Sequence, residues 1–157
     1  MDGPMNALER GQLGVMRVRS GLVALQLLGV GAVAEFLLMR RDWWPVGAIA
    51  APLVALSAYL VLIAPGRRYR AWGYALGDES LRVAYGVWTR METHVLLVRV
   101  QHIDVSQGPI ERAFGVCRLI LHTAGTLNSR IVLPGLSRGT AEAIRDDVRA
   151  RIRTEDA

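Results

Sequence analysis

The 157-residue sequence contains no lysine and a single cysteine, Cys117. One cysteine excludes an internal disulfide and any metal site built from several thiolates, and its place in an apolar run indicates a small core residue. All 19 basic residues are therefore arginine, a skew that we attribute to genome composition rather than to mechanism. The resulting net charge of +5 favours an anionic partner, and membrane lipid and nucleic acid are the two candidate classes.

Charged residues are also scarce along two stretches of the first half. Hydrophobic residues make up 52% of the chain and the mean hydropathy is +0.26, which is high for a soluble domain of this length. The apolar runs cover residues 21–38 and 44–63, and each is long enough for a helix that crosses about 30 Å of hydrocarbon. The short connection between them predicts a two-helix transmembrane hairpin over residues 20–64.

The arginines that flank the two spans predict the orientation of this hairpin. Three arginines precede the first span (Arg10, Arg17 and Arg19) and three follow the second (Arg67, Arg68 and Arg70). The connection contains only two, Arg40 and Arg41. Because arginine accumulates on the cytoplasmic side, we expect a multi-pass protein of the inner (cytoplasmic) membrane with both termini in the cytoplasm. Residues 1–19 would form a cytoplasmic N-terminal segment.

A cleaved signal peptide is the alternative interpretation of the first span. Arginines precede an apolar run that ends in Ala32-Val33-Ala34, which resembles a cleavage site. Apolar sequence continues beyond this point and a second span follows almost at once, so the hairpin is favoured. Cleavage would remove residues 1–34, and the intact mass of the purified protein distinguishes the two interpretations.

A few polar and small residues within the spans invite a functional explanation. Glu35 lies close enough to the connection to reach lipid headgroups or the two arginines there, whereas Gln26 is deeper and is able to hydrogen-bond across helices. Gly47, Ala51 and Ala55 repeat on one helix face and would allow the close approach of the first span or of a second copy. One amide on two helices does not line a transport path, so a small-molecule transporter is disfavoured.

The second half predicts a small mainly-β domain over residues 67–153. Pro65-Gly66 is interpreted as a linker, after which the apolar period becomes two. A strand hairpin at 72–76 and 81–87 precedes strand-like runs at 92–98, 100–106, 116–123 and 130–133, typical of a small sandwich or barrel. Ser137 then offers an N-cap for an amphipathic helix over 137–153, with Ala141, Ile144 and Val148 on its apolar stripe.

Catalysis receives little support from the sequence. His102 and Asp104 share one face of an extended strand, so an imidazole–carboxylate pair is allowed. No nucleophile turn or phosphate loop accompanies them, and His94 and His122 have no metal-ligand spacing with them. We therefore expect no enzyme activity and no catalytic, cofactor-binding or metal-binding residue, and we assign these side chains to hydrogen bonds that fix strand ends and turns.

Three segments carry a resemblance to a known family: HVLLVRVQHIDVSQGPIERAFG at 94–115, LILHTAG at 119–125 and LPGLSRGTAEAIRDDV at 133–148. They resemble the membrane-flanked bacterial pleckstrin-homology domain family, in particular its YdbS-like branch. The matched positions in the first segment are Arg99, Gln101, Val105, Gln107, Gly108, Pro109, Glu111, Arg112 and Gly115. The resemblance implies two bent antiparallel sheets capped by a C-terminal helix, after a transmembrane helical hairpin.

The same resemblance implies partners but no ligand. Relatives are often encoded beside a larger membrane protein with repeated copies of the domain, and some such pairs are implicated in resistance to antimicrobial peptides. Phosphoinositide binding is not carried over from the eukaryotic namesakes, because a fold does not imply a ligand and no dense basic loop is present.

Two hypotheses from different functional classes follow. The preferred one is assembly with that partner, or as a homo-oligomer, through Arg99, Gln101, Gln107 and Arg112 if these side chains point outward together. Ion pairs of Arg99 with Glu111, or of Arg112 with Asp104, would instead make them structural. The alternative is contact of Arg67, Arg68 and Arg70 with anionic lipid headgroups, helped by Arg145, Arg149 and Arg153 on the C-terminal helix. Nucleic acid is not expected as a partner of a membrane protein of this kind.

Overall fold

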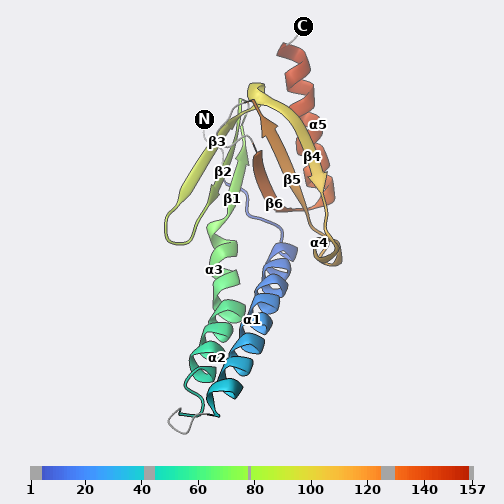
Figure 1. Ribbon diagram of the computed structural model, residues 1–157. Helices are drawn as coiled ribbons and strands as arrows, with labels where there is room; N and C mark the ends of the chain where they lie inside the picture. Colours follow the sequence, from blue (N-terminus) through green and yellow to red (C-terminus); the bar gives the residue numbers. More distant parts are fainter. Residues whose placement is uncertain (1–4, 41–44, 78, 125–129, 156–157) are drawn as a thin grey trace. The chain divides into compact units, whose positions relative to one another are not determined.

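The computed structural model describes residues 5–40, 45–77, 79–124 and 130–155, with side chains as far as Arg151 (Figure 1). The chain divides into two compact units. One comprises residues 16–67 and is called the helical hairpin. The other combines the described residues up to Val15 with those from Arg68 onward and is called the β-module.

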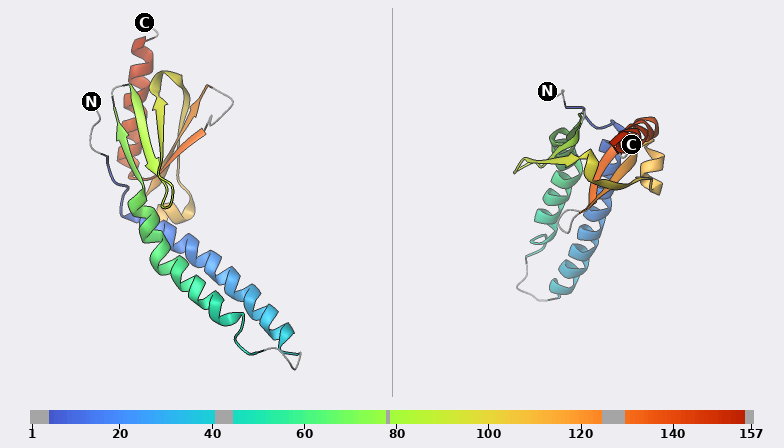
Figure 2. Two further views of the ribbon diagram at one scale, coloured as in Figure 1. Left: turned by 90° about the vertical axis from the view of Figure 1, so that its left-hand side faces the viewer. Right: turned by 90° about the horizontal axis from the view of Figure 1, so that it is seen from above.

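The helical hairpin contains the greater part of two long apolar helices that lie side by side (Figures 1 and 2). The first is α1 (Gly11–Leu38), and the second runs without a break through α2 (Ala50–Ala58), the π-helical turn η1 (Tyr59–Ile63) and α3 (Ala64–Ala71). Both are long and apolar enough to cross a membrane, with mean hydropathies of 2.0 for residues 11–38 and 1.5 for residues 50–71. Each helix extends beyond the span expected from the sequence at the end that leads to the β-module.

The expected linker at Pro65-Gly66 is wrong, because both residues lie within α3. A proline inside a helix has no N–H, and its ring collides with the carbonyl four residues earlier. The π-helical turn directly before it spaces the backbone more widely, with the Ala64 N–H donating to the carbonyl of Tyr59, and so accommodates the ring. The helix therefore continues past Pro65 to Ala71.

Glu35 stabilises the connection between the two helices. Its carboxylate accepts hydrogen bonds from the backbone N–H groups of Gly47, Ile49 (3.2 Å) and Ala50 (2.8 Å), where α2 begins. The first N–H groups of a helix have no partner within the helix, and a carboxylate there also interacts favourably with the helix dipole. The interpretation of Glu35 as a partner of headgroups or connection arginines is therefore corrected: Glu35 is a helix cap. Arg41 lies outside the described residues.

Of the three small residues on the expected face, only Gly47 contacts the first helix, through its hydrogen bond to Glu35, and Ala51 and Ala55 do not contribute to the packing of the two helices. Leu53 packs so closely against Gly31 that a side-chain carbon at Gly31 would have no room. Ala51 and Ala55 are exposed on α2, and Gln26 is exposed on α1. Within the helical hairpin, the face expected to approach the first span is thus open.

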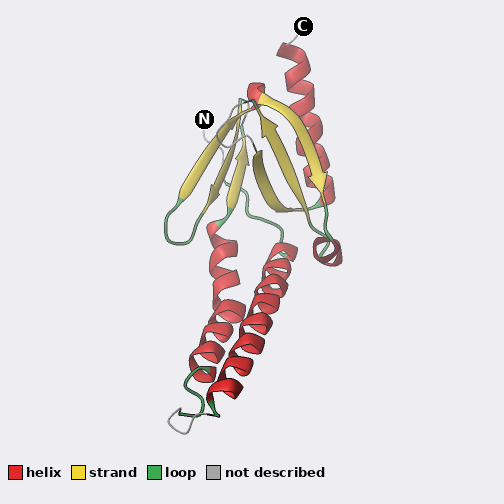
Figure 3. Cartoon of the chain, in the orientation of Figure 1, coloured by secondary structure: helices red, strands yellow, loops and turns green. Residues whose placement is uncertain are grey.

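The β-module contains two three-stranded antiparallel sheets and a C-terminal helix (Figure 3). The first sheet has the order β1 (Gly73–Leu76), β2 (Ser80–Tyr85), β3 (Met91–Leu96). The turn η2 (Leu97–Arg99) leads into the second sheet, with the order β4 (Val100–Ser106), β5 (Cys117–Thr123), β6 (Arg130–Leu136). The short helix α4 (Pro109–Ala113) connects β4 to β5, and α5 (Arg138–Glu155) follows β6. This architecture confirms the fold class predicted from the sequence.

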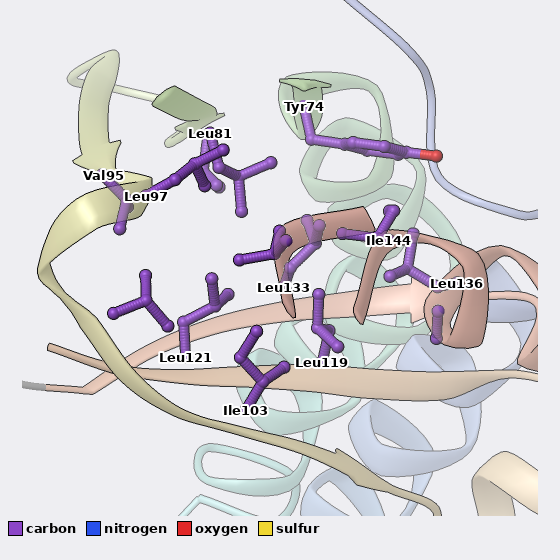
Figure 4. Close-up of a cluster of buried hydrophobic side chains, with 14 of the residues drawn as sticks. Tyr74, Leu81, Val95, Leu97, Ile103, Leu119, Leu121, Leu133, Leu136 and Ile144 are labelled. Atoms are coloured by element: carbon purple, nitrogen blue, oxygen red, sulfur yellow. The ribbon is translucent and has the colours of Figure 1, made fainter. Parts of the chain in front are cut away.

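The core of the β-module lies between the two sheets and α5. Figure 4 shows Leu81 and Val95 of the first sheet, Leu119 and Leu121 of the second and Ile144 of α5 directed toward one another. Leu81, Leu119 and Leu121 are completely buried. The apolar stripe of α5 packs here, and the Oγ atom of Ser137 accepts a hydrogen bond from the Thr140 N–H at 3.1 Å, as predicted for an N-cap.

Residues before the first span belong to the β-module. The backbone of Asn6 exchanges hydrogen bonds of 2.6 and 3.0 Å with Tyr74 on β1, and the Glu9 N–H donates to Gly135 on β6 at 2.8 Å. Leu8 and Val15 are buried. The sequence instead predicts a separate segment 1–19 and a domain that begins at residue 67.

Candidate functional site

The four residues proposed from the sequence as an interaction surface do not form one outward-facing set. Arg99 and Gln101 are exposed, and Gln101 is the extra residue of a β-bulge, because Val100 and His102 align with the adjacent residues Thr123 and His122. The side chain of Gln107 is instead turned inward, where its amide donates to the Val116 carbonyl at 2.9 Å.

The short helix α4 begins at the Gly108-Pro109 turn, and a buried carboxylate stabilises it. Glu111 is 4% exposed, accepts a hydrogen bond from the Gly108 N–H at 2.7 Å and forms an ion pair with Arg118, 2.6 Å from Nη2 to Oε1. The expected pairing of Glu111 with Arg99 is replaced by this contact, because α4 directs Glu111 toward the first residues of β5. Arg112, the neighbouring residue on α4, is exposed.

His102, Asp104 and His122 form a polar cluster on the solvent-exposed face of the second sheet. The Asp104 carboxylate lies 3.2 Å from Nε2 of His102 and 3.5 Å from Nε2 of His122, across the β4–β5 pair. Asp104 thus pairs with histidines rather than with Arg112. Within the described ranges, no three or more His, Cys, Asp or Glu residues are grouped so as to hold a metal ion. The cluster ties neighbouring strands together.

A groove of about 410 Å³ lies between β4 and α5, and we call it the arginine groove. Figure 1 shows α5 beside β4 and β5. The lining residues come from β4, from the β4–β5 connection, from the start of β5 and from one face of α5, and they are Ile103, Asp104, Val105, Gln107, Arg112, Cys117, Arg138, Glu142, Arg145 and Arg149.

The charges of the arginine groove are unevenly paired. Arg138 binds Glu142 at 2.9 Å and Arg145 binds Asp146 at 2.9 Å. The hydrogen bond from Arg145 lowers the pKa of the Asp146 carboxyl, which therefore stays ionised. Arg112 and Arg149 form no salt bridge with any residue that the structure describes, although the charge of Arg149 also contributes to the lowered pKa of Asp146. Two guanidinium groups are thus available to an incoming anion.

The one thiol that borders the arginine groove is not a nucleophile. Cys117 is 1% exposed, and burial raises the pKa of its thiol. The neutral Sγ–H group donates to the Leu136 carbonyl at 3.4 Å. The groove therefore offers binding groups and no activated side chain.

Comparison with known proteins matches residues 18–152 to the family described as the bacterial PH domain. The chain belongs to the bacterial PH domain family. This bacterial PH domain protein is 29% identical over 155 residues to the UPF0699 transmembrane protein YdbS of Bacillus subtilis (strain 168). The alignment covers 98% of the chain and 96% of that relative. No solved structure matches the chain.

The family and this relative define the protein coarsely. It is a membrane-associated, YdbS-like protein with a bacterial PH domain, and its two apolar helices agree with the relative's description as a transmembrane protein. Both point to a non-catalytic module.

The arginines proposed to contact lipid lie on α3 of this bacterial PH domain protein. Arg67, Arg68 and Arg70 are all exposed. Within the β-module, Arg70 also lines a second cavity of about 360 Å³ together with Asn6 and Arg90. Arg90 was not singled out by the sequence, because it is isolated in the turn between β2 and β3.

Only part of the arginine groove is predicted by the sequence. The sequence indicates Gln107, Arg112, Arg145 and Arg149 for other reasons, but it assigns them to two different surfaces. Arg138 and Glu142 escaped notice, although residues 138, 142, 145 and 149 recur at helical spacings of four and three. The side chain of Arg153 lies outside the described part of the chain.

Proposed function

We propose that this protein is a non-enzymatic integral protein of the cytoplasmic membrane that presents its β-module for assembly with another protein. The preferred partner is a larger membrane protein with related domains, and a second copy of this chain is the other possibility. The arginine groove carries this proposal, because a polar groove with two unpaired guanidinium groups on a membrane-tethered module provides a docking site without catalytic groups.

The cytoplasmic placement of the β-module is part of this proposal. It is supported by the arginines that flank the hairpin, which are more numerous before the first span and after the second than in the connection between the spans. The pairing of Asn6 with Tyr74 also supports it, because residues before the first span and after the second pair with each other, as expected if both ends of the hairpin lie on the same side of the membrane.

Co-purification tests the assembly. The full-length protein, carrying an affinity tag at its C-terminus, is extracted from native membranes in mild detergent, and its mass is measured by light scattering. We expect a complex larger than the monomer in which one partner, or a second copy, is present in a fixed ratio. Recovery of a monomer alone, with and without the product of the neighbouring gene, would contradict the proposal.

We further propose that the assembly acts in the cell envelope and contributes to resistance against antimicrobial peptides. This step rests on the resemblance to relatives encoded beside larger partners. A deletion strain should be inhibited by a lower concentration of a cationic peptide than its parent, and the intact gene should restore growth. Equal sensitivity of the two strains would remove this part of the proposal.

Recognition of anionic lipid is the second candidate function. It is supported by the exposure of Arg68 and Arg70 on α3 and by the cavity that Arg70 shares with Arg90. Each arginine near an anionic surface contributes about 1 kcal/mol, which orients a module without selecting a particular lipid.

Hydrogen exchange of the full-length protein in nanodiscs tests the lipid hypothesis. Amides of residues 68–77 should exchange more slowly when phosphatidylglycerol is added to phosphatidylcholine, and salt should abolish the difference. Exchange that is indifferent to lipid charge and to salt would count against this function.

A further inference from the structure

We propose that the arginine groove and the outer edge of β4 together bind an extended, acidic segment of the partner, which adds to the second sheet as a further strand. This inference rests on the proposed assembly function and specifies its site. Three features of the β-module support this site: the open edge of β4, the groove beside it and two arginines in the groove that form no salt bridge.

The edge of β4 differs from two other sheet edges of the β-module. An edge strand presents unpaired N–H and C=O groups, and proteins usually cover such edges. Here the N-terminal segment covers part of β1 through Asn6 and part of β6 through Glu9. Among the described residues, no further backbone group pairs with β4, which bonds only to β5 in its sheet.

The lining of the arginine groove shows that this open edge faces it. Ile103, Asp104 and Val105 are consecutive and all line the groove. Because successive side chains of a strand point to opposite faces, three consecutive residues share only the backbone edge. The groove therefore gives access to a row of peptide donors and acceptors, and the seven residues of β4 provide an edge of about 23 Å.

The excess of arginine over carboxylate in the groove favours the binding of an acidic segment. Four arginines line it against the carboxylates of Asp104 and Glu142. Arg112 lies on α4 at one end and Arg149 lies on α5, and neither has a salt-bridge partner among the residues that the structure describes. A guanidinium group binds a carboxylate through two parallel hydrogen bonds, so Asp or Glu side chains of an added strand fit these positions.

The same features argue against a lipid headgroup as the occupant. A phosphate would pair with the arginines, but it would leave the alternating donors and acceptors of β4 unused. An extended peptide uses both, because main-chain hydrogen bonds provide affinity and side chains provide specificity in strand addition.

Hydrogen exchange on the purified complex tests the mode of binding. The full-length complex and the full-length chain alone are compared in the same detergent. We expect amides within residues 100–106 to exchange about tenfold more slowly in the complex, together with a partner segment rich in Asp and Glu. Unchanged exchange of β4, or a protected partner segment without net negative charge, would overturn the inference.

Charge reversal tests the site. The double variant Arg112→Glu/Arg149→Glu should lose about tenfold or more of the co-purified partner, because paired charges at an interface become repulsive. The matched control Arg99→Glu/Arg130→Glu reverses two exposed arginines outside the groove and should retain the partner. Thermal melting of both variants verifies that the fold is intact.

The outcomes separate the inference from the proposed function. If the wild type recovers a partner and the groove variant recovers it equally well, the groove inference fails while the assembly function stands. Loss of the partner in the control alone also refutes the groove and favours the surface around Arg99. If the wild type recovers no partner, both fail. If the groove variant changes only the phosphatidylglycerol that co-purifies, a lipid occupies the groove and the inference is overturned.

Discussion

Glu111 is the single side chain on which the β4–β5 connection most depends. It caps the N-terminus of α4 and pairs with Arg118 while almost entirely buried. Replacement Glu111→Leu leaves the Gly108 N–H and the Arg118 guanidinium without this acceptor, so we expect the free energy of unfolding to fall by about 2 kcal/mol. Chemical denaturation in detergent measures the change.

Arg138→Ala provides the comparison for this prediction. Arg138 is 74% exposed and forms an i,i+4 pair with Glu142, so its removal should cost less than about 0.5 kcal/mol. Equal effects of the two substitutions would show that the burial of Glu111 is not important for stability.

The phenol of Tyr74 should make the free energy of unfolding depend on pH at high pH. Burial raises the pKa of its phenol, and the carboxylate of Glu9 adds to this effect. The unfolded chain ionises near pH 10, so the neutral folded phenol contributes stability below this pH that is lost as the pH rises toward the folded pKa. Tyr74→Phe should therefore lose less stability than the wild type between about pH 9 and 11. Identical pH profiles in equilibrium unfolding would refute the prediction.

For single residues, the sequence predicts which side chains are buried better than it predicts which side chains pair with one another. The core position of Cys117 follows from its apolar neighbours, because burial depends on local pattern. The pairing of Glu111 with Arg118, seven positions apart, depends on the direction in which α4 turns the chain, and spacing alone does not contain this information.

Among the secondary-structure elements, α2 depends on a cap from the preceding helix. Removing the carboxylate with Glu35→Ala leaves the first N–H groups of α2 without their acceptor, so the hairpin should lose about 1–2 kcal/mol. Circular dichroism of thermal unfolding in detergent measures this loss. Val33→Ala, on an exposed position of the same helix, should change stability much less, and a larger effect of Val33→Ala would contradict the role of Glu35.

Two glycines near the C-terminus offer a matched pair of substitutions. Gly135 in β6 has a φ of +70°, and a Cβ there would lie 2.7 Å from the side chain of Gln12. Gly135→Ala should cost about 2 kcal/mol or more, because strain and collision add. Gly139 in α5 has open space around it, so Gly139→Ala should stabilise by about 0.5–1 kcal/mol. Denaturation midpoints compare the two, and similar midpoints would contradict the packing of Gln12 on β6.

The sequence predicts most elements of this protein, because each has its own hydrophobic period. The bounds of β4 agree with the expected run of residues 100–106, and α5 follows its predicted cap. The π-helical turn could not be predicted, since proline followed by glycine normally ends a helix and only the backbone shows how the turn before it makes room.

At the scale of the whole molecule, the first residues fix how the protein is processed. Leu8 belongs to the core of the β-module and Gln12 and Val15 are also buried, so a chain cleaved after Ala34 would lose part of this packing. We therefore expect the mature protein to retain residues 1–34, and mass spectrometry of the intact protein should give the full-length mass. A mass that begins at Glu35 would show that the first span is a signal peptide.

The assembly of the β-module from both ends of the chain is the part that the sequence did not reveal. Asn6 and Tyr74 are separated by two apolar spans, and a segment of a few residues has too little periodicity to predict a strand pairing. The arginine groove was missed for a related reason, because its members come from β4, α4 and α5 and meet only after folding.

This split assembly also determines the order in which the protein matures. The first residues leave the ribosome long before the strands that they cover, so the edges of β1 and β6 are protected only after the membrane segments have been synthesised. A shortened soluble version that begins at Arg67 would keep every strand and still expose both edges, together with the apolar surface that Leu8 covers. Such a fragment would tend to self-associate through these edges, and a soluble version should instead join residues 5–15 to residue 68 through a flexible linker.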